Sequence, residues 1–97
     1  MHNRDILTGF EYPFYYVVAD VWNPKTEEYE REKIATMQTY EEAISFAKAT
    51  PVNEDTLQVE VFQDNYEDDE VVAIKVAVSD DPPGYYFYNP LTEKEIK

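Results

Sequence analysis

Apolar and polar residues alternate with a period of two in the second half of the chain, as is typical of β-strands. In TLQVEVFQ, residues 56–63, Leu57, Val59 and Val61 share one face. The stretch VVAIKVAVS, residues 71–79, carries apolar side chains on both faces. This pattern predicts two strands, the second of which lies in the interior of a sheet.

The same two stretches are predicted to pair as an antiparallel hairpin. We expect a register that places Val61 opposite Ile74. That register also places Glu60 opposite Lys75, and a cross-strand pair of opposite charges is stabilising. The segment between the strands, DNYEDDE at residues 64–70, is expected to be the connecting loop.

An earlier hairpin is predicted around the turn NPKT, residues 23–26. Phe14 to Trp22 is rich in β-branched and aromatic residues, which favour strands. Asn23 can accept a hydrogen bond from nearby backbone, and Pro24 presets φ for a type I turn. The chain then returns as a strand over about residues 28–36.

The returning segment also has some helical character. Glutamate and lysine favour helices, and Glu27 and Arg31 have the spacing of a helical ion pair. However, Thr39 and Glu42 form a capping box, which marks the start of a helix further along the chain. Neither face of a strand at 28–36 is apolar enough for the centre of a sheet. We therefore predict an edge strand whose glutamates face water.

A single helix is predicted over YEEAISFAKA, residues 40–49. Tyr40, Ala43, Ile44 and Ala47 have the i, i+3, i+4, i+7 spacing of one buried stripe. Pro51 follows directly after the helix and prevents its continuation.

The order of elements predicts a single α+β domain over residues 1–97. Its fold class is ββαββ, with one antiparallel sheet and the helix packed on one face. Pro82, Pro83 and Gly84 interrupt the chain, and Tyr85 to Tyr88 predict a short fifth strand at the C-terminus. Residues 1–9 and 92–97 are expected to be frayed termini.

Charge is the most unusual property of the sequence. The chain has 21 acids and 8 bases, a net charge of −13. Residues 51–81 hold 10 of the acids and one base, Lys75. Such a surface repels nucleic acid and anionic membranes and attracts basic proteins. The acids also have a simpler interpretation, because net charge by itself keeps a small protein soluble.

Residue types that carry catalysis or bind metals are scarce. The chain has no cysteine, and its only histidine is His2 near the N-terminus. An imidazole metal site or a Ser-His-Asp triad therefore cannot be assembled. Residues 64–70 resemble the start of an EF-hand loop, but Asp69 stands where the turn requires glycine. We expect no enzymatic activity, no cofactor and no bound metal.

Two groups of carboxylates are the candidate binding residues. On a strand, Glu28, Glu30 and Glu32 stand about 6.8 Å apart on one face, twice the about 3.4 Å spacing of phosphates along one DNA strand. The segment at residues 64–70 supplies the second group, with a tyrosine as candidate anchor: Asp64, Tyr66, Glu67, Asp68, Asp69 and Glu70. Together they predict a surface that occupies a basic groove. The alternative is that both groups are simply solvated.

In its small size, acidity, lack of cysteine and sheet-plus-helix pattern, the chain resembles in character the phage-encoded inhibitors that mimic DNA and the bacterial toxin-immunity proteins. The likeness extends to no motif. The absence of a signal peptide and of a long apolar segment predicts a cytoplasmic location. A rival interpretation is a structural or accessory protein that forms a homodimer through its tyrosine-rich strand or a sheet edge.

Overall fold

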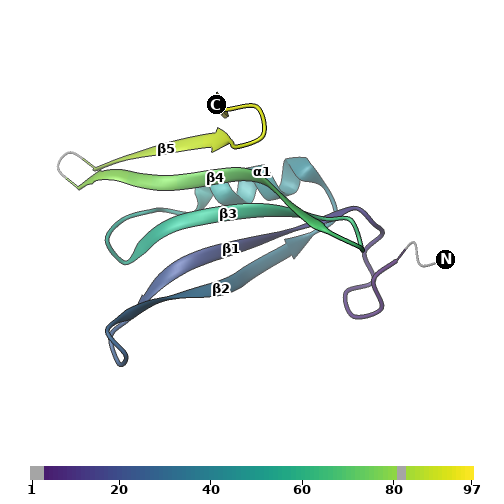
Figure 1. The fold of residues 1–97 in the computed structure, drawn as a ribbon, viewed down its shortest axis with the longest axis horizontal. Coiled ribbons are helices and arrows are strands. Elements are labelled where there is room, and N and C mark those ends of the chain that lie inside the picture. The colour runs from purple at the N-terminus through teal and green to yellow at the C-terminus, as the bar shows by residue number, and fades with distance from the viewer. Residues whose placement is uncertain (1–3, 81–82) are drawn as a thin grey trace.

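The computed structural model describes residues 4–80 and 83–97. Within them, one antiparallel sheet of six strands has the order β2-β1-β3-β4-β5-β6, and one helix packs on it. The elements are β1 Phe14–Asn23, β2 Glu28–Met37, α1 Tyr40–Ala49, β3 Thr56–Asp64, β4 Asp69–Asp80, β5 Pro83–Asn89 and β6 Lys94–Glu95. The predicted fold class is confirmed, and the C-terminal segment adds a further short strand, β6. Figure 1 looks onto the uncovered face of the sheet, with α1 behind it.

Three predictions fall outside the described residues: the position of His2, the fraying of residues 1–3 and the chain break at Pro82. Of the segments expected to fray, residues 94–95 form β6, which pairs with β5. Within the part of the chain that the structure describes, no helix has the length and apolar character needed to cross a membrane.

The β1–β2 hairpin is confirmed, and β2 is the edge strand of the sheet. The side-chain oxygen of Asn23 accepts a hydrogen bond from the backbone N–H of Lys25 at 2.9 Å, as the turn chemistry predicts. A β-bulge lies between Val17 and Val18, whose partners on β2 are Ala35 and Lys33. Ile34 is the extra residue on β2, and a bulge of this kind bends the strand locally.

The helix has the predicted bounds and the predicted cap. The Thr39 hydroxyl accepts from the Glu42 backbone N–H, and the Glu42 carboxylate accepts from the Thr39 backbone N–H. Ala43, Ile44 and Ala47 are buried along one stripe. Because two of these three residues are alanines, α1 can approach the sheet closely.

The hydrophobic core lies between α1 and the sheet. Its buried members are Val17, Ala19, Ala43, Ile44, Ala47, Val59, Val61, Val72, Ala73 and Phe87. They come from α1, β1, β3, β4 and β5, so the three central strands and the helix share one core. Alternate residues of these strands must therefore point to the opposite face, which no element covers in the described part of the chain.

The predicted register of the β3–β4 hairpin is wrong. Val61 pairs with Ala73, and Glu60 pairs with Ile74 rather than with Lys75. The register shift between Val61 and Phe62 leaves Val72 as an extra residue on β4. A one-residue displacement exchanges the two faces of a strand, so Lys75 points to the helix and Glu60 to the uncovered face.

Lys75 is only 2 % exposed and caps the helix instead of pairing with an acid. Its Nζ donates to the carbonyl oxygens of Ala47 at 3.1 Å, Lys48 at 2.9 Å and Thr50 at 2.6 Å. These carbonyls lie at the C-terminal end of α1, where backbone acceptors lack intrahelical partners. Burial lowers the pKa of the Lys75 ammonium group.

We call the uncovered side of the sheet the open face. By the strand register it carries Phe14, Tyr16, Val18, Asp20 and Trp22 of β1; Tyr29, Arg31, Lys33 and Thr36 of β2; Gln58, Glu60, Phe62 and Asp64 of β3; Asp69, Val71, Ile74 and Val76 of β4; and Tyr86 and Tyr88 of β5. The predicted aromatic strand at residues 85–88 divides its rings between the two faces. Phe87 is buried against the helix side, whereas Tyr86 and Tyr88 stack at 4.8 Å on the open face.

Candidate functional site: the acidic end of the sheet

The predicted acidic loop is shorter than expected. Asp64 is the last residue of β3, and Asp69 and Glu70 belong to β4, so only residues 65–68 connect the strands. The prediction that all of residues 64–70 form a loop is therefore wrong. Strand pairing continues to the Asp64–Asp69 pair because the turn is tight and well hydrogen-bonded. We call Asp64–Glu70 the hairpin end.

Local hydrogen bonds hold the backbone of the hairpin end. The Asp64 carboxylate accepts from the Tyr66 backbone N–H at 2.9 Å, and Asn65 N–H donates to the Asp68 carbonyl at 2.9 Å. Tyr66 has a φ of 78°, a conformation that the adjoining turn stabilises. The carboxylates of this turn therefore project from a defined backbone.

The register places Asp64 directly opposite Asp69. Like charges in such a position destabilise a strand pair. The Tyr16 hydroxyl donates a hydrogen bond to the Asp69 carboxylate, which offsets part of the repulsion. Burial, followed by this hydrogen bond, raises the pKa of Tyr16. Among residues 4–80 and 83–97, no ion pair involves an acid of the hairpin end.

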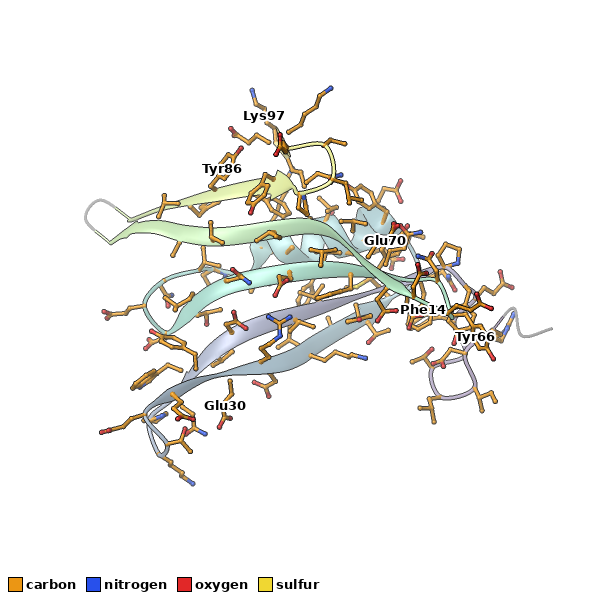
Figure 2. The ribbon with its side chains drawn as sticks, viewed as in Figure 1. Phe14, Glu30, Tyr66, Glu70, Tyr86 and Lys97 are labelled. Carbon is orange, nitrogen blue, oxygen red and sulfur yellow. The ribbon has the colours of Figure 1, made fainter. Side chains whose placement is uncertain are left out.

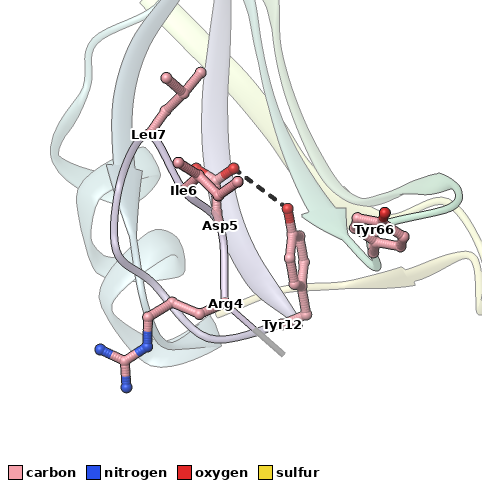
Figure 3. A pocket seen from close by; sticks show the side chains of 6 residues that line it. All are labelled: Arg4, Asp5, Ile6, Leu7, Tyr12 and Tyr66. Atoms are coloured by element: carbon pink, nitrogen blue, oxygen red, sulfur yellow. Dashed lines mark hydrogen bonds between the residues drawn. The ribbon is translucent and has the colours of Figure 1, made fainter. Parts of the chain in front are cut away.

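Tyr66 contacts the N-terminal segment. Its ring meets the ring of Tyr12 edge-on, with centroids 5.3 Å apart. The Tyr12 hydroxyl donates to the Asp5 carboxylate at 3.3 Å, the dashed contact in Figure 3. Partial burial and the Asp5 charge raise the pKa of Tyr12, while hydrogen bonding to Thr8 lowers the pKa of Asp5. Tyr66, with 57 % of its surface exposed, is thus positioned beside the acids.

A hollow of about 370 Å³ lies between the hairpin end and the N-terminal segment. Figure 3 shows its lining residues: Arg4, Asp5, Ile6, Leu7, Tyr12 and Tyr66. Ile6 and Leu7 stand at the tip of a turn and are 87 % and 94 % exposed. The Asp5 carboxylate closes this turn by accepting from the Thr8 backbone N–H at 2.9 Å. This turn was not predicted from the sequence, although the Asp5-to-Thr8 spacing and Gly9 indicate it.

The second predicted group stays exposed on the edge strand. Glu28, Glu30 and Glu32 all face solvent, as predicted. Glu32 pairs with Ala19 and Glu28 with Asn23, whereas Asp64 pairs with Phe14 at the other end of β1. Measured along β1 at about 3.4 Å per residue, the glutamate row is offset from the Asp64 position by about 17 Å at Glu32 and about 31 Å at Glu28.

The glutamate row and the hairpin end therefore form two separate patches. Figure 2 shows Glu30 far from Tyr66 and Glu70. The strand acids of the hairpin end are divided between the two sides of the sheet: Asp69 shares the side of Tyr16 on the open face, and Glu70, opposite Gln63, lies on the helix side. Glu32 shares the helix side with the buried Ala19.

The remaining polar clusters serve the fold. Arg31 bridges two carboxylates, Glu60 at 2.6 Å and Asp20 at 3.4 Å, and this contact with Glu60 raises the pKa of Arg31. This cluster was not predicted from the sequence, because its members come from three strands. Among the described residues, no three Asp, Glu, His or Cys side chains are arranged to hold a metal ion.

The geometry therefore presents one dense acidic patch at the hairpin end and one dispersed row of glutamates on β2. Neither patch carries a histidine or a serine that could act with a carboxylate as a nucleophile and base. The carboxylates of the hairpin end can accept hydrogen bonds from cationic groups and form ion pairs with them.

No family model matches the chain, and no curated protein or solved structure matches it either.

Proposed function

We propose that this protein is a non-enzymatic, cytoplasmic binding protein that blocks a basic surface of another protein. The hairpin end is the contact, with Glu67 and Asp68 at its turn and Tyr66 as an aromatic anchor beside them. Aromatic residues next to charged rims are enriched in protein interfaces.

The pairing of Asp64 with Asp69 is the observation that carries the proposal. The hairpin end contains five acids and no base within seven residues. Its folding must overcome the mutual repulsion of these carboxylates. A partner that supplies arginine or lysine side chains would remove that repulsion, so the patch gains more from binding than dispersed acids would.

Basic grooves of this kind are typical of proteins that handle nucleic acids, because they bind phosphates. The proposed target is such a protein, and the carboxylates take the place of phosphates in its groove. The basic cleft of a toxin offers the same chemistry, which also fits an immunity-type role. The glutamate row, about 6.8 Å between neighbours, provides a second contact for a target large enough to reach it.

The test begins with capture of the target. The tagged chain of residues 1–97 is incubated with host lysate at low salt and washed at rising salt, and the eluted proteins are identified by mass spectrometry. We expect a basic, nucleic-acid-handling protein that elutes as salt rises, because exposed charges are screened within about 10 Å at 0.1 M. Duplex DNA should compete with the chain for that protein.

Charge reversal locates the contact on the chain. Glu67→Lys combined with Asp68→Lys should weaken binding at least about tenfold, a loss of about 1.4 kcal/mol. The matched control is Glu54→Lys with Asp55→Lys. This adjacent pair is also exposed and changes the net charge equally, but it precedes β3 rather than following it. Equal weakening by both double variants would show that only net charge matters and would overturn the assignment to the hairpin end.

A further inference from the structure

The open face is an extensive half-buried surface that no element of the described chain covers. Tyr16 and Phe62 stack at 5.0 Å with an interplanar angle of 4°, and Tyr86 stacks on Tyr88. Ile74 and Val76 on β4 lie between these aromatic pairs, and Val18 lies on β1 opposite Glu60. Soluble monomers rarely expose a continuous apolar patch larger than about 300–600 Å².

The dimensions of the open face match those of a protein interface. Strands β1 and β3 contain 10 and 9 residues, and about 3.4 Å per residue makes the face about 30 Å long. Five neighbouring strands, in the order β2, β1, β3, β4 and β5, span about 24 Å at about 4.8 Å per strand. The product is about 700 Å², close to the about 800 Å² that each partner buries in a stable complex.

The charges in the middle of the open face are balanced, in contrast to the rest of the molecule. Asp20 and Glu60 are matched by Arg31, which bonds to both, and by Lys33, whose Nζ lies 4.3 Å from the Tyr16 ring centroid. These two acids and two bases sum to zero, whereas the whole chain carries −13. Asp64 and Asp69 add two negative charges at one end of this face, where the Asp69 carboxylate accepts from Tyr16.

The area and the charge of the open face together indicate which kind of partner binds to it. We infer that the open face is the interface between two copies of this chain, related by a twofold axis with their sheets packed face to face. Strongly acidic copies repel each other through any other surface, but here they meet on a face whose central charges are balanced and whose ion pairs are already formed. Packed sheets lie about 10 Å apart at a small angle, so the dimer has helices on its two outer sides.

This inference does not depend on the proposed function. The turn of the hairpin end lies beyond the strands, so it stays accessible in the dimer. The two associations also respond to salt in opposite directions. Salt weakens a complex between an acidic patch and a basic partner, but it strengthens a dimer of two copies that each carry −13 by screening their repulsion.

Sedimentation equilibrium of the full chain, from micromolar to millimolar concentration, tests the inference. We expect a mass of twice 11.4 kDa, with dissociation only on dilution. Val76→Glu places a charge at the centre of the interface and should weaken the dimer at least about tenfold. Tyr86→Lys is a second variant on the same face. Tyr86 is exposed on β5, so this variant tests the interface even if the interior strand β4 does not tolerate the charge of Val76→Glu.

The matched control is Phe46→Glu, because Phe46 lies on α1, on the other side of the sheet from the open face, and is 37 % exposed. Phe46→Glu should leave the dimer intact, and circular dichroism should show that all three variants keep the fold. A mass of 11.4 kDa for the unchanged chain at millimolar concentration would overturn the inference. So would a dimer that survives both open-face variants, or one that Phe46→Glu dissociates.

Discussion

The Nζ atom of Lys75 on β4 lies 2.6 Å from the carbonyl oxygen of Thr50, the C-cap residue of α1. With its bonds to Ala47 and Lys48, this side chain ties the end of the helix to an interior strand of the sheet. Its ammonium also lies 4.6 Å from the ring centroid of Tyr85 on β5. One buried cation thus connects three elements through backbone carbonyls and an aromatic ring.

Replacement of Lys75 by methionine tests this connection. Lys75→Met keeps the length of the side chain but leaves the three carbonyls without their shared donor. We expect the free energy of unfolding to fall by about 2–4 kcal/mol, measured by urea denaturation. Lys25→Met, in the exposed turn between β1 and β2, should change it by less than about 0.5 kcal/mol. Similar losses for both variants would contradict the capping role.

The raised pKa of Tyr16 predicts that the stability of the fold decreases at alkaline pH. Its pKa is raised above the usual 10.0, chiefly by burial, so the folded chain holds this proton after the unfolded chain has released it. The stability that neutral Tyr16 provides is fully present below pH 10.0 and decreases as pH rises further toward the folded pKa. The decrease is at most about 1.4 kcal/mol per pH unit.

Tyr16→Phe isolates that contribution, because the other tyrosines titrate in both proteins. At about pH 8 the variant should be less stable by about 1 kcal/mol, since it lacks the hydrogen bond to Asp69. Above about pH 10 the difference should shrink and then reverse. Urea denaturation of both proteins across this range measures it, and a difference that stays constant with pH would refute the prediction.

The Arg31–Glu60 contact on the open face predicts a non-additive pair of substitutions. Glu60 is only 8 % exposed, and Arg31→Met removes its cationic partner. We expect a loss of about 1–2 kcal/mol, below the value for a fully buried pair because Arg31 is half exposed. Adding Glu60→Met should restore part of that loss. A double variant whose loss equals the sum of the single losses would show that the pair is not coupled.

Repulsion among the carboxylates of the hairpin end should lower the stability of the fold at low salt. Glu67→Lys with Asp68→Lys relieves repulsion among its carboxylates, so this double variant should have a higher Tm than the unchanged chain. The gain should disappear in about 1 M salt, where charges are screened beyond about 3 Å. Thermal denaturation at both salt concentrations measures the effect. A lower Tm at low salt would mean that these acids stabilise the turn.

The order and bounds of the elements could be predicted from local patterns. The capping box at Thr39 and Glu42 placed the helix, and alternation from Leu57 to Val61 placed β3. The register could not be predicted, because a β-bulge at Val72 adds one residue without altering the apolar pattern of β4. The prediction therefore paired Lys75 with Glu60, although the two side chains lie on opposite faces.

The candidate site, like the fold, could be predicted from the sequence only in part. The acidic character of the hairpin end and the exposure of Glu28, Glu30 and Glu32 follow from composition and spacing. Their separation into two patches follows from the sheet order, since β2 pairs only with β1 and the hairpin end extends from β3 and β4. The position of Tyr66 beside Tyr12 likewise depends on a contact between residues far apart in the sequence.

The sequence by itself determined the periodicity, the caps and the charge, because these depend on residues a few positions apart. Tertiary structure alone decided which side chains meet: Lys75 with the end of α1, Arg31 with Glu60, and Asp64 with Asp69. The physical reason is that strand pairing and bulges set the facing partners, and a shift of one residue exchanges the two faces of a strand. The balanced charge in the middle of the open face is also a result of that pairing, in a chain whose composition is strongly acidic.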